Sequence, residues 1–426
     1  MKNKIYLLIV FLMLIDIVHA QEINLAVQFR PRAEFRNGYS LPIAENQKPA
    51  FFVQHRGRVT MDYKSELIDF KIAAQDVRVW GNTALLSTVD NNFGIHELYT
   101  QINLKKNFAI KLGRQEIKYD NERFFGAVDW SQAALSHDAL LVKYTTNKVD
   151  AQLGVAYNQS GIRTNGTYYN VGKNYKTLQY LWARYSPNDV FKISGLFLNN
   201  GMQASKNNST DTTKTNFSQT FGTYMLLTKG KIKADLSAYY QFGKTQSWDN
   251  NKLSAFEVSA SINYQPIKLL NIGIGYEYLS GNKSNSTKTN AFTPFYGTNH
   301  KFNGWMDYYF VGNHTNSVGL QDINAQINIK HDKFSTSLIY HHFNTADGSN
   351  YKLGNLGDEL DFQLQVPIYK FIKCTVGYSH YFTTDELNAL KGITTPKKSQ
   401  DWLWFALDIN TTIFNWKKKD DTNETK

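Results

Sequence analysis

Long polar connections alternate with tight turns along this chain, and the segments between them switch between apolar and polar residues at every second position. The nine long connections are Asn37 to Ala50, Gly81 to Gly94, Lys118 to Ser136, Gln159 to Lys173, Asn200 to Asn216, Gly243 to Lys252, Gly281 to Val318, Thr345 to Gly354 and Thr384 to Lys398. The eight short ones are Lys64 to Ile68, Lys105 to Lys106, Thr146 to Asn147, Pro187 to Asp189, Lys229 to Gly230, Gln265 to Ile267, His331 to Asp332 and Pro367 to Tyr369. This alternation predicts about eighteen antiparallel strands, with both chain ends on the side of the short turns.

Each predicted strand has an apolar face and a polar face. Residues 232–241 place Ile, Ala, Leu and Tyr at even positions, and Lys, Asp, Ser, Tyr and Gln at odd positions. A soluble β-sandwich alternates in the same way, but its strands run about 5 to 6 residues. These run about 10 to 13, near the tilted span of a bilayer. The predicted fold class is therefore all-β: a single transmembrane antiparallel β-barrel with long extracellular loops, short periplasmic turns and a water-filled channel.

Composition and the N-terminus agree with an outer-membrane protein. A hydrophobic content of 42% and a mean hydropathy of -0.44 are too polar for helical spans. Lys2 and Lys4 precede the apolar run Ile5 to Ile15, and Val18 to Ala20 supplies small residues at the cleavage positions. Residues 1–20 are predicted to be a secretory signal peptide. Residues 21–416 are predicted to form the barrel, in the cell outer membrane of a Gram-negative bacterium, and residues 417–426 a polar tail.

The chain is basic, with a net charge of +11, and removing the two lysines and one aspartate of the signal peptide leaves +10. A positive balance can indicate nucleic-acid binding. However, no basic run interleaves with aromatic residues on a helix, and no nucleic-acid module is recognisable. A basic lumen or basic outer loops explain the charge, so no nucleic-acid partner is predicted.

The arginines are unevenly distributed. All ten precede residue 185: Arg30, Arg32, Arg36, Arg56, Arg58, Arg78, Arg114, Arg123, Arg163 and Arg184. Arg58 shares parity with Asp62, and Arg78 with Asp76, so these charges are expected to face the lumen, because arginine on the lipid face near the midplane costs about 2 to 4 kcal/mol. Two interpretations remain open: an arginine ladder that binds an anionic polymer weakly and repeatedly, and ion pairs that stiffen the wall.

Seven motifs carry a family resemblance. They are QHRGRVTMDYKSELIDFKIAAQDVRVWGN at Gln54 to Asn82, IHELY at Ile95 to Tyr99, LGRQEI at Leu112 to Ile117, RFFGAVDWSQ at Arg123 to Gln132, HDALLVKY at His137 to Tyr144, LGDELDF at Leu356 to Phe362 and VGYSHYF at Val376 to Phe382. Together they resemble the alginate-export family of outer-membrane porins, over Gln54 to Trp416. QDVRVWG followed by LGRQE is a fairly specific pair.

The resemblance implies a monomeric eighteen-stranded barrel with an electropositive constriction, through which an anionic polysaccharide of the polyuronate class leaves the periplasm by passive diffusion. The expected lining residues, with the carboxylates expected to orient them, are Arg58, Arg78, Arg114, Arg123, Asp76, Glu97 and Asp129. Expected partners are the polysaccharide, outer-membrane lipid and periplasmic export factors, and no cofactor is expected. Ala134 and Leu135 stand where the family pattern has Gly-Arg, so the implication covers the class of polymer and not alginate itself.

Two other functions fit the same barrel. One is a general anion or oligosaccharide uptake porin. The other is an outer-membrane hydrolase, which needs a nucleophile and a base within hydrogen-bond reach. The available histidines are His96, His137, His341, His342 and His380, but none lies in a nucleophile motif or a metal-binding pattern such as HExxH. No catalytic residue, enzymatic activity or metal site is therefore predicted.

Two further features concern the loops. The connection Gly281 to Val318 contains Phe292, Phe295, Tyr296, Trp305 and Tyr308. These rings can stack on sugar or pack the loop into the lumen as a lid, and we expect the lid. The carboxylates of Asp358, Glu359 and Asp361 can suggest calcium, but that ion takes six or more oxygens, so a solvated strand end is expected there.

Overall fold

The computed structural model describes residues 21–169, 171–172, 174–204, 214–246, 252–282, 286–309, 318–346 and 354–418. The predicted signal peptide, residues 1–20, and positions 419–426 of the predicted tail lie outside the described residues. Among the described residues, no helix is long and apolar enough to cross a membrane.

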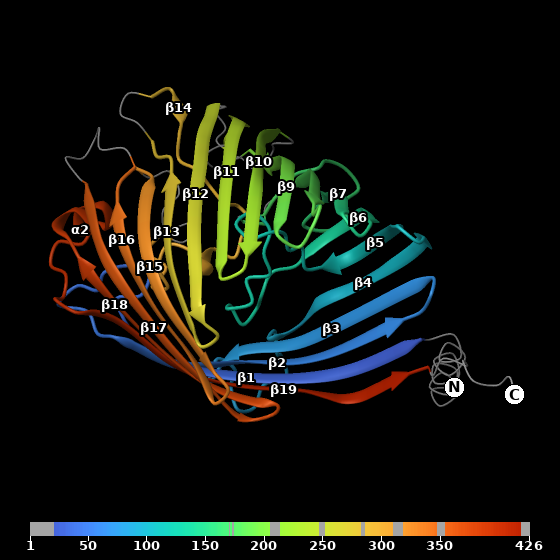
Figure 1. Cartoon of the computed structure of the whole chain (residues 1–426), viewed down its shortest axis with the longest axis horizontal. Helices are drawn as coiled ribbons and strands as arrows, with labels where there is room; N and C mark the ends of the chain where they lie inside the picture. The colour runs from blue at the N-terminus through green and yellow to red at the C-terminus, as the bar shows by residue number, and fades with distance from the viewer. Residues whose placement is uncertain are drawn as a thin grey trace, which may run out of the picture.

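A closed antiparallel sheet forms the barrel (Figure 1). Its eighteen long strands, counted over the described residues, are β1 (Glu22–Asn37), β2 (Ala50–Lys64), β3 (Ile68–Val79), β4 (Phe93–Lys105), β5 (Phe108–Gln115), β6 (His137–Thr145), β7 (Val149–Tyr157), β8 (Thr177–Tyr185), β9 (Phe191–Gln203), β10 (Thr215–Lys229), β11 (Ile232–Lys244), β12 (Lys252–Ile267), β13 (Leu270–Leu279), β15 (Leu320–His331), β16 (Phe334–Asn344), β17 (Asn355–Tyr369), β18 (Ile372–Thr383) and β19 (Gln400–Lys417). Glu22 pairs with Lys417, so β1 and β19 close the barrel. The predicted fold class is confirmed.

The long connections contain three short elements. They are β14 (Lys288–Thr289), the 3-10 helix η1 (Asn299–Lys301) and the helix α2 (Asp385–Lys391). β14 pairs in parallel with the start of β12 and lies beside its upper end in Figure 1. Thr384 caps α2, because its side chain accepts a hydrogen bond from the backbone N–H of Leu387 at 3.2 Å.

Two short turns lie further along the chain than predicted. β12 continues through Pro266, and β17 continues through Pro367. At each proline the pairing with the next strand shifts register. A proline lacks the N–H that regular pairing between strands needs, but a β-bulge or similar irregularity in the pairing accommodates it. The sequence prediction treated these prolines as turn residues, whereas they lie at irregular positions within strands.

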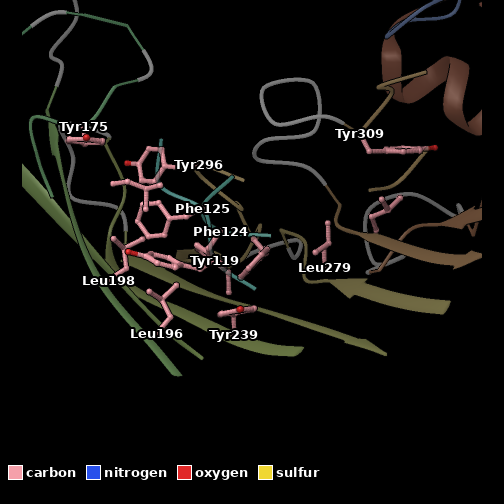
Figure 2. Close-up of a cluster of buried hydrophobic side chains, with 14 of the residues drawn as sticks. Tyr119, Phe124, Phe125, Tyr175, Leu196, Leu198, Tyr239, Leu279, Tyr296 and Tyr309 are labelled. Carbon is pink, nitrogen blue, oxygen red and sulfur yellow. The ribbon is translucent and has the colours of Figure 1, made fainter. Parts of the chain in front are cut away.

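Two long connections enter the lumen and interlock. We call residues 116–136 the first inward loop and residues 286–309 the second inward loop. The backbone N–H of Gly126 donates to Tyr296 O at 3.0 Å, and that of Thr298 to Glu122 O at 2.9 Å. Figure 2 shows Phe124, Phe125 and Tyr296 packed together inside the barrel. The expectation that the connection Gly281 to Val318 packs into the lumen is confirmed for its described part, in which Tyr296 and Tyr308 are buried.

Candidate functional site

Arg58 faces the lumen from the middle of β2. Its Nε and Nη2 atoms donate to Oε1 of Gln75 at 2.9 and 2.6 Å. The amide of Gln75 in turn donates to Ala133 O, in the first inward loop, at 2.9 Å. Val59 and Met61 lie on the opposite face of β2 and are exposed to the surroundings of the barrel. The orientation expected for Arg58 from its alternation is therefore observed.

Asp76 and Arg78 face outward, and their expected lumen orientation is corrected. In the register between β2 and β3, Arg58 lies opposite Gln75, whereas Arg78 lies opposite His55. Arg78 donates to Asp76 and, at 2.7 Å, to Asp90 in the outer loop. Asp76 and Arg78 do lie on the same face of β3, as predicted. However, the face that even-numbered residues occupy in β2 is not the one they occupy in β3, because the turn between the strands sets the register.

Arg114 also faces outward. It lies opposite Leu98 and Asp138, and Leu98 and Leu112 are exposed on the same face. Its Nε donates to Ile95 O and its Nη1 to Asp138, both at 3.0 Å. The expected position of Arg114 in a constriction is therefore corrected: it belongs to the outer surface near the extracellular rim.

Arg123 lies in the first inward loop and is buried rather than open to the lumen. Its Nη2 donates to Glu277 at 2.8 Å and to Asn303 at 3.1 Å. It also lies over the ring of Phe302, at 4.5 Å from the ring centroid. Arg123 thus ties the first inward loop to the second and to β13.

The two remaining predicted residues, Glu97 and Asp129, are inside the barrel. Glu97 pairs with Lys71 at 2.6 Å. Asp129 bridges Arg30 and Arg56, at 3.2 and 2.8 Å. Arg30 and Arg56 therefore hold the first inward loop against β1 and β2. For these two arginines, the contacts favour ion pairs that stiffen the wall over a ladder that binds a polymer.

A basic lumen wall includes two lysines that the arginine-based prediction missed. Lys143 Nζ donates to Gln101 Oε1 at 3.1 Å, and Lys111 Nζ lies 3.8 Å from the ring centroid of Tyr99. We call Arg58, Lys111 and Lys143 the lumen cations. Over the described part of the chain, none of the three has an ion pair with a carboxylate. In the sequence, the alternation of apolar and polar residues along β2, β5 and β6 was the signal that could have placed these two lysines in the lumen with Arg58.

The opposite wall is acidic. The lumen-facing carboxylates of β12, β13, β15 and β17 belong to Glu257, Glu277, Asp322, Glu359 and Asp361. Glu359 accepts the backbone N–H of Met306 at 2.7 Å, and Asp361 accepts that of Trp305 at 3.2 Å. The expectation of a solvated strand end was wrong for these two residues, which are fully buried anchors of the second inward loop.

A cavity of about 580 Å³ lies beside the inward loops. Its basic lining residues are Arg184, Lys192, Lys233 and Lys301, and its acidic ones include Asp120, Asp235 and Glu277. Lys192 and Lys233 lie near the short-turn ends of β9 and β11, so the cavity opens toward the periplasmic side.

One constellation resembles catalytic and metal sites. Ser136 Oγ and Glu116 Oε1 each lie 2.9 Å from a ring nitrogen of His96. The hydroxyl of Ser136 donates to His96 O at 2.6 Å, so its proton is not directed at the imidazole. Burial raises the pKa of Glu116, but hydrogen bonds from His96 and Lys118 outweigh it and hold that pKa at about 2.

The carboxylates of Glu97 and Glu116, beside His96, are already paired with lysines. His96, Glu97 and Glu116 bring three ligand atoms within 4.8 Å of one another. Lys118 pairs with Glu116 at 3.0 Å, in addition to the pairing of Lys71 with Glu97. Two ammonium groups in the positions of a cation favour a network that stabilises the wall.

Comparisons with known proteins agree with this architecture. A family model described as alginate export matches residues 21–398. OpdL from Pseudomonas aeruginosa has a similar structure, with a TM-score of 0.64 and 11% identity over 92% of this chain and 99% of that one. OccAB1 from Acinetobacter baumannii has a TM-score of 0.62 and 12% identity, over 92% of this chain and 97% of that one. The outer membrane protein OpdK from Pseudomonas aeruginosa has a TM-score of 0.61 and 8% identity, over 92% of this chain and 99% of that one.

The comparison with curated proteins gives no match. The fold is nevertheless that of outer-membrane porins. Because the family model spans most of the sequence, the chain belongs to the alginate export family of outer-membrane β-barrels.

Proposed function

We propose that this protein is a passive outer-membrane channel for an acidic polysaccharide of the polyuronate class, moving outward along the basic wall of the lumen. The observation that carries the proposal is the set of lumen cations, whose charges are not neutralised by carboxylates of the described chain. The other lumen arginines, such as Arg56, are committed to the inward loop. The lumen cations remain available to a passing anion.

The chemistry of these groups suits transit rather than tight binding. Lysine is a mobile point charge, whereas arginine binds a carboxylate with a fixed fork of donors. Two of the three lumen cations are lysines. A polymer that carries one carboxylate per sugar can exchange such contacts one at a time, which keeps each binding step weak enough to leave.

The opposite wall leaves this preference to the lumen cations. Glu277 and Asp322 lie across the barrel and are each paired with a basic side chain, Arg123 and His341 respectively. The lumen cations therefore add a net positive field on their side of the lumen. The interlocked inward loops reduce the open cross-section and bring a solute close to the wall. Lys192 and Lys233 in the periplasmic cavity are suited to receiving the polymer from export factors.

Planar-bilayer conductance tests the proposal. Arg58→Gln, Lys111→Gln and Lys143→Gln are combined, and the matched control combines Arg78→Gln and Arg114→Gln on the outer surface. We expect the wild-type channel to prefer anions and to be blocked by oligouronate. The triple variant should lose the anion preference and bind the blocker about tenfold more weakly, a change of about 1.4 kcal/mol.

Three results would overturn the proposal: an unaltered triple variant, an equal effect in the outer-surface control, or a cation-selective wild-type pore. Equal block by monomeric uronate and by the oligomer would instead favour a general anion uptake porin. Monomer and oligomer are compared at equal carboxylate concentration, so that charge alone does not decide the outcome.

A further inference from the structure

Three lysines meet at the extracellular ends of neighbouring strands, far from the lumen cations. Lys244 ends β11 and lies opposite Lys252, the first residue of β12. Lys252 in turn pairs in parallel with Lys288 of β14. All three are exposed. We call them the rim lysines, and within the described residues none of them has an ion pair.

The rim lysines on β11 and β12 belong to the lipid-facing side of the barrel. Lys244 shares its face with Phe242 and Tyr240, each 37% exposed, and Lys252 shares its face with Phe256, 43% exposed. The intervening Leu253 is buried on the lumen side. The cluster therefore lies directly above an aromatic band, at the level where the outer-leaflet headgroups begin.

Three neighbouring ammonium groups repel one another unless an anion lies between them. Like charges directly opposite each other on neighbouring strands are destabilising. Elsewhere on the outer surface, the cations Arg78 and Arg114 are paired with Asp90 and Asp138. The rim lysines lack such carboxylates within the described structure, although β14 adds a third positive charge to the pair.

We propose that the rim lysines bind the phosphate groups of a phosphorylated glycolipid of the outer leaflet. Each lysine near a charged lipid surface contributes about 1 kcal/mol. Strands lie about 4.8 Å apart, so three adjacent lysines span about 10 Å. That width suits a headgroup that carries more than one phosphate, with its acyl chains along the aromatic band of Phe242 and Phe256.

Lipid retention tests the site. Purified full-length protein is incubated with a bisphosphorylated glycolipid or its dephosphorylated form, and bound lipid is counted by native mass spectrometry. The triple variant is Lys244→Gln, Lys252→Gln and Lys288→Gln. The matched control, on the periplasmic rim, is Lys229→Gln, Lys268→Gln and Lys333→Gln. We expect wild type and control to retain the phosphorylated form at least about tenfold better, and the rim variant to retain both forms equally.

Two competitors identify the source of the phosphate. Excess inorganic phosphate should leave the glycolipid bound, because the acyl chains also contribute. Excess oligouronate should leave it bound as well, since the rim lysines lie outside the lumen. Undiminished retention by a folded rim variant, or displacement by either competitor, would overturn the inference. Heat-modifiable migration in gel electrophoresis checks that each variant forms a closed barrel.

Discussion

Gly297 lies where the two inward loops cross. A Cβ atom added at this position would lie 2.2 Å from the backbone oxygen of Arg123, and backbone cannot move aside as a flexible side chain can. We therefore expect Gly297→Ala to separate the loops, with more frequent open events in single-channel recordings and faster proteolysis near residue 125. Gly161→Ala is the control, because nothing lies within 4 Å of its added Cβ. Unchanged recordings from Gly297→Ala would show that the crossing does not limit the pore.

At the scale of one element, β17 separates its two faces sharply. Glu359 and Asp361 point inward and accept backbone N–H groups of the second inward loop, whereas Asp358 faces outward and pairs with His342 at 2.8 Å. Each such hydrogen bond contributes about 0.5 to 1.5 kcal/mol to stability.

Combined Glu359→Ala and Asp361→Ala substitutions should therefore release the second inward loop and raise single-channel conductance. Asp358→Asn, one residue away on the other face, should leave conductance at the wild-type value. If both variants conduct alike, the carboxylates of β17 do not hold the loop.

The strands themselves were predictable from the sequence, because a period of two and a regular series of turns depend on neighbouring residues. The outward placement of Arg78 and Arg114 was not. Both lie near the rim, where an arginine on the lipid face costs only about 0 to 1 kcal/mol, so the energetic argument for a lumen position loses its force. The anchoring of Met306 by Glu359 joins segments distant in sequence, and alternation within either one contains no information about it.

For the whole molecule, the proposed selectivity depends on the electric field of the lumen cations, and that field is screened by salt. The Debye length is about 10 Å at 0.1 M ionic strength and about 3 Å at 1 M. We therefore expect the anion preference, measured as the reversal potential at a fixed salt ratio across the membrane, to fall steeply between these concentrations. The Arg58, Lys111 and Lys143 triple variant should show little salt dependence. A preference that is independent of salt would mean that the inward loops select solutes by size, and that the charges of the lumen serve mainly to hold those loops in place.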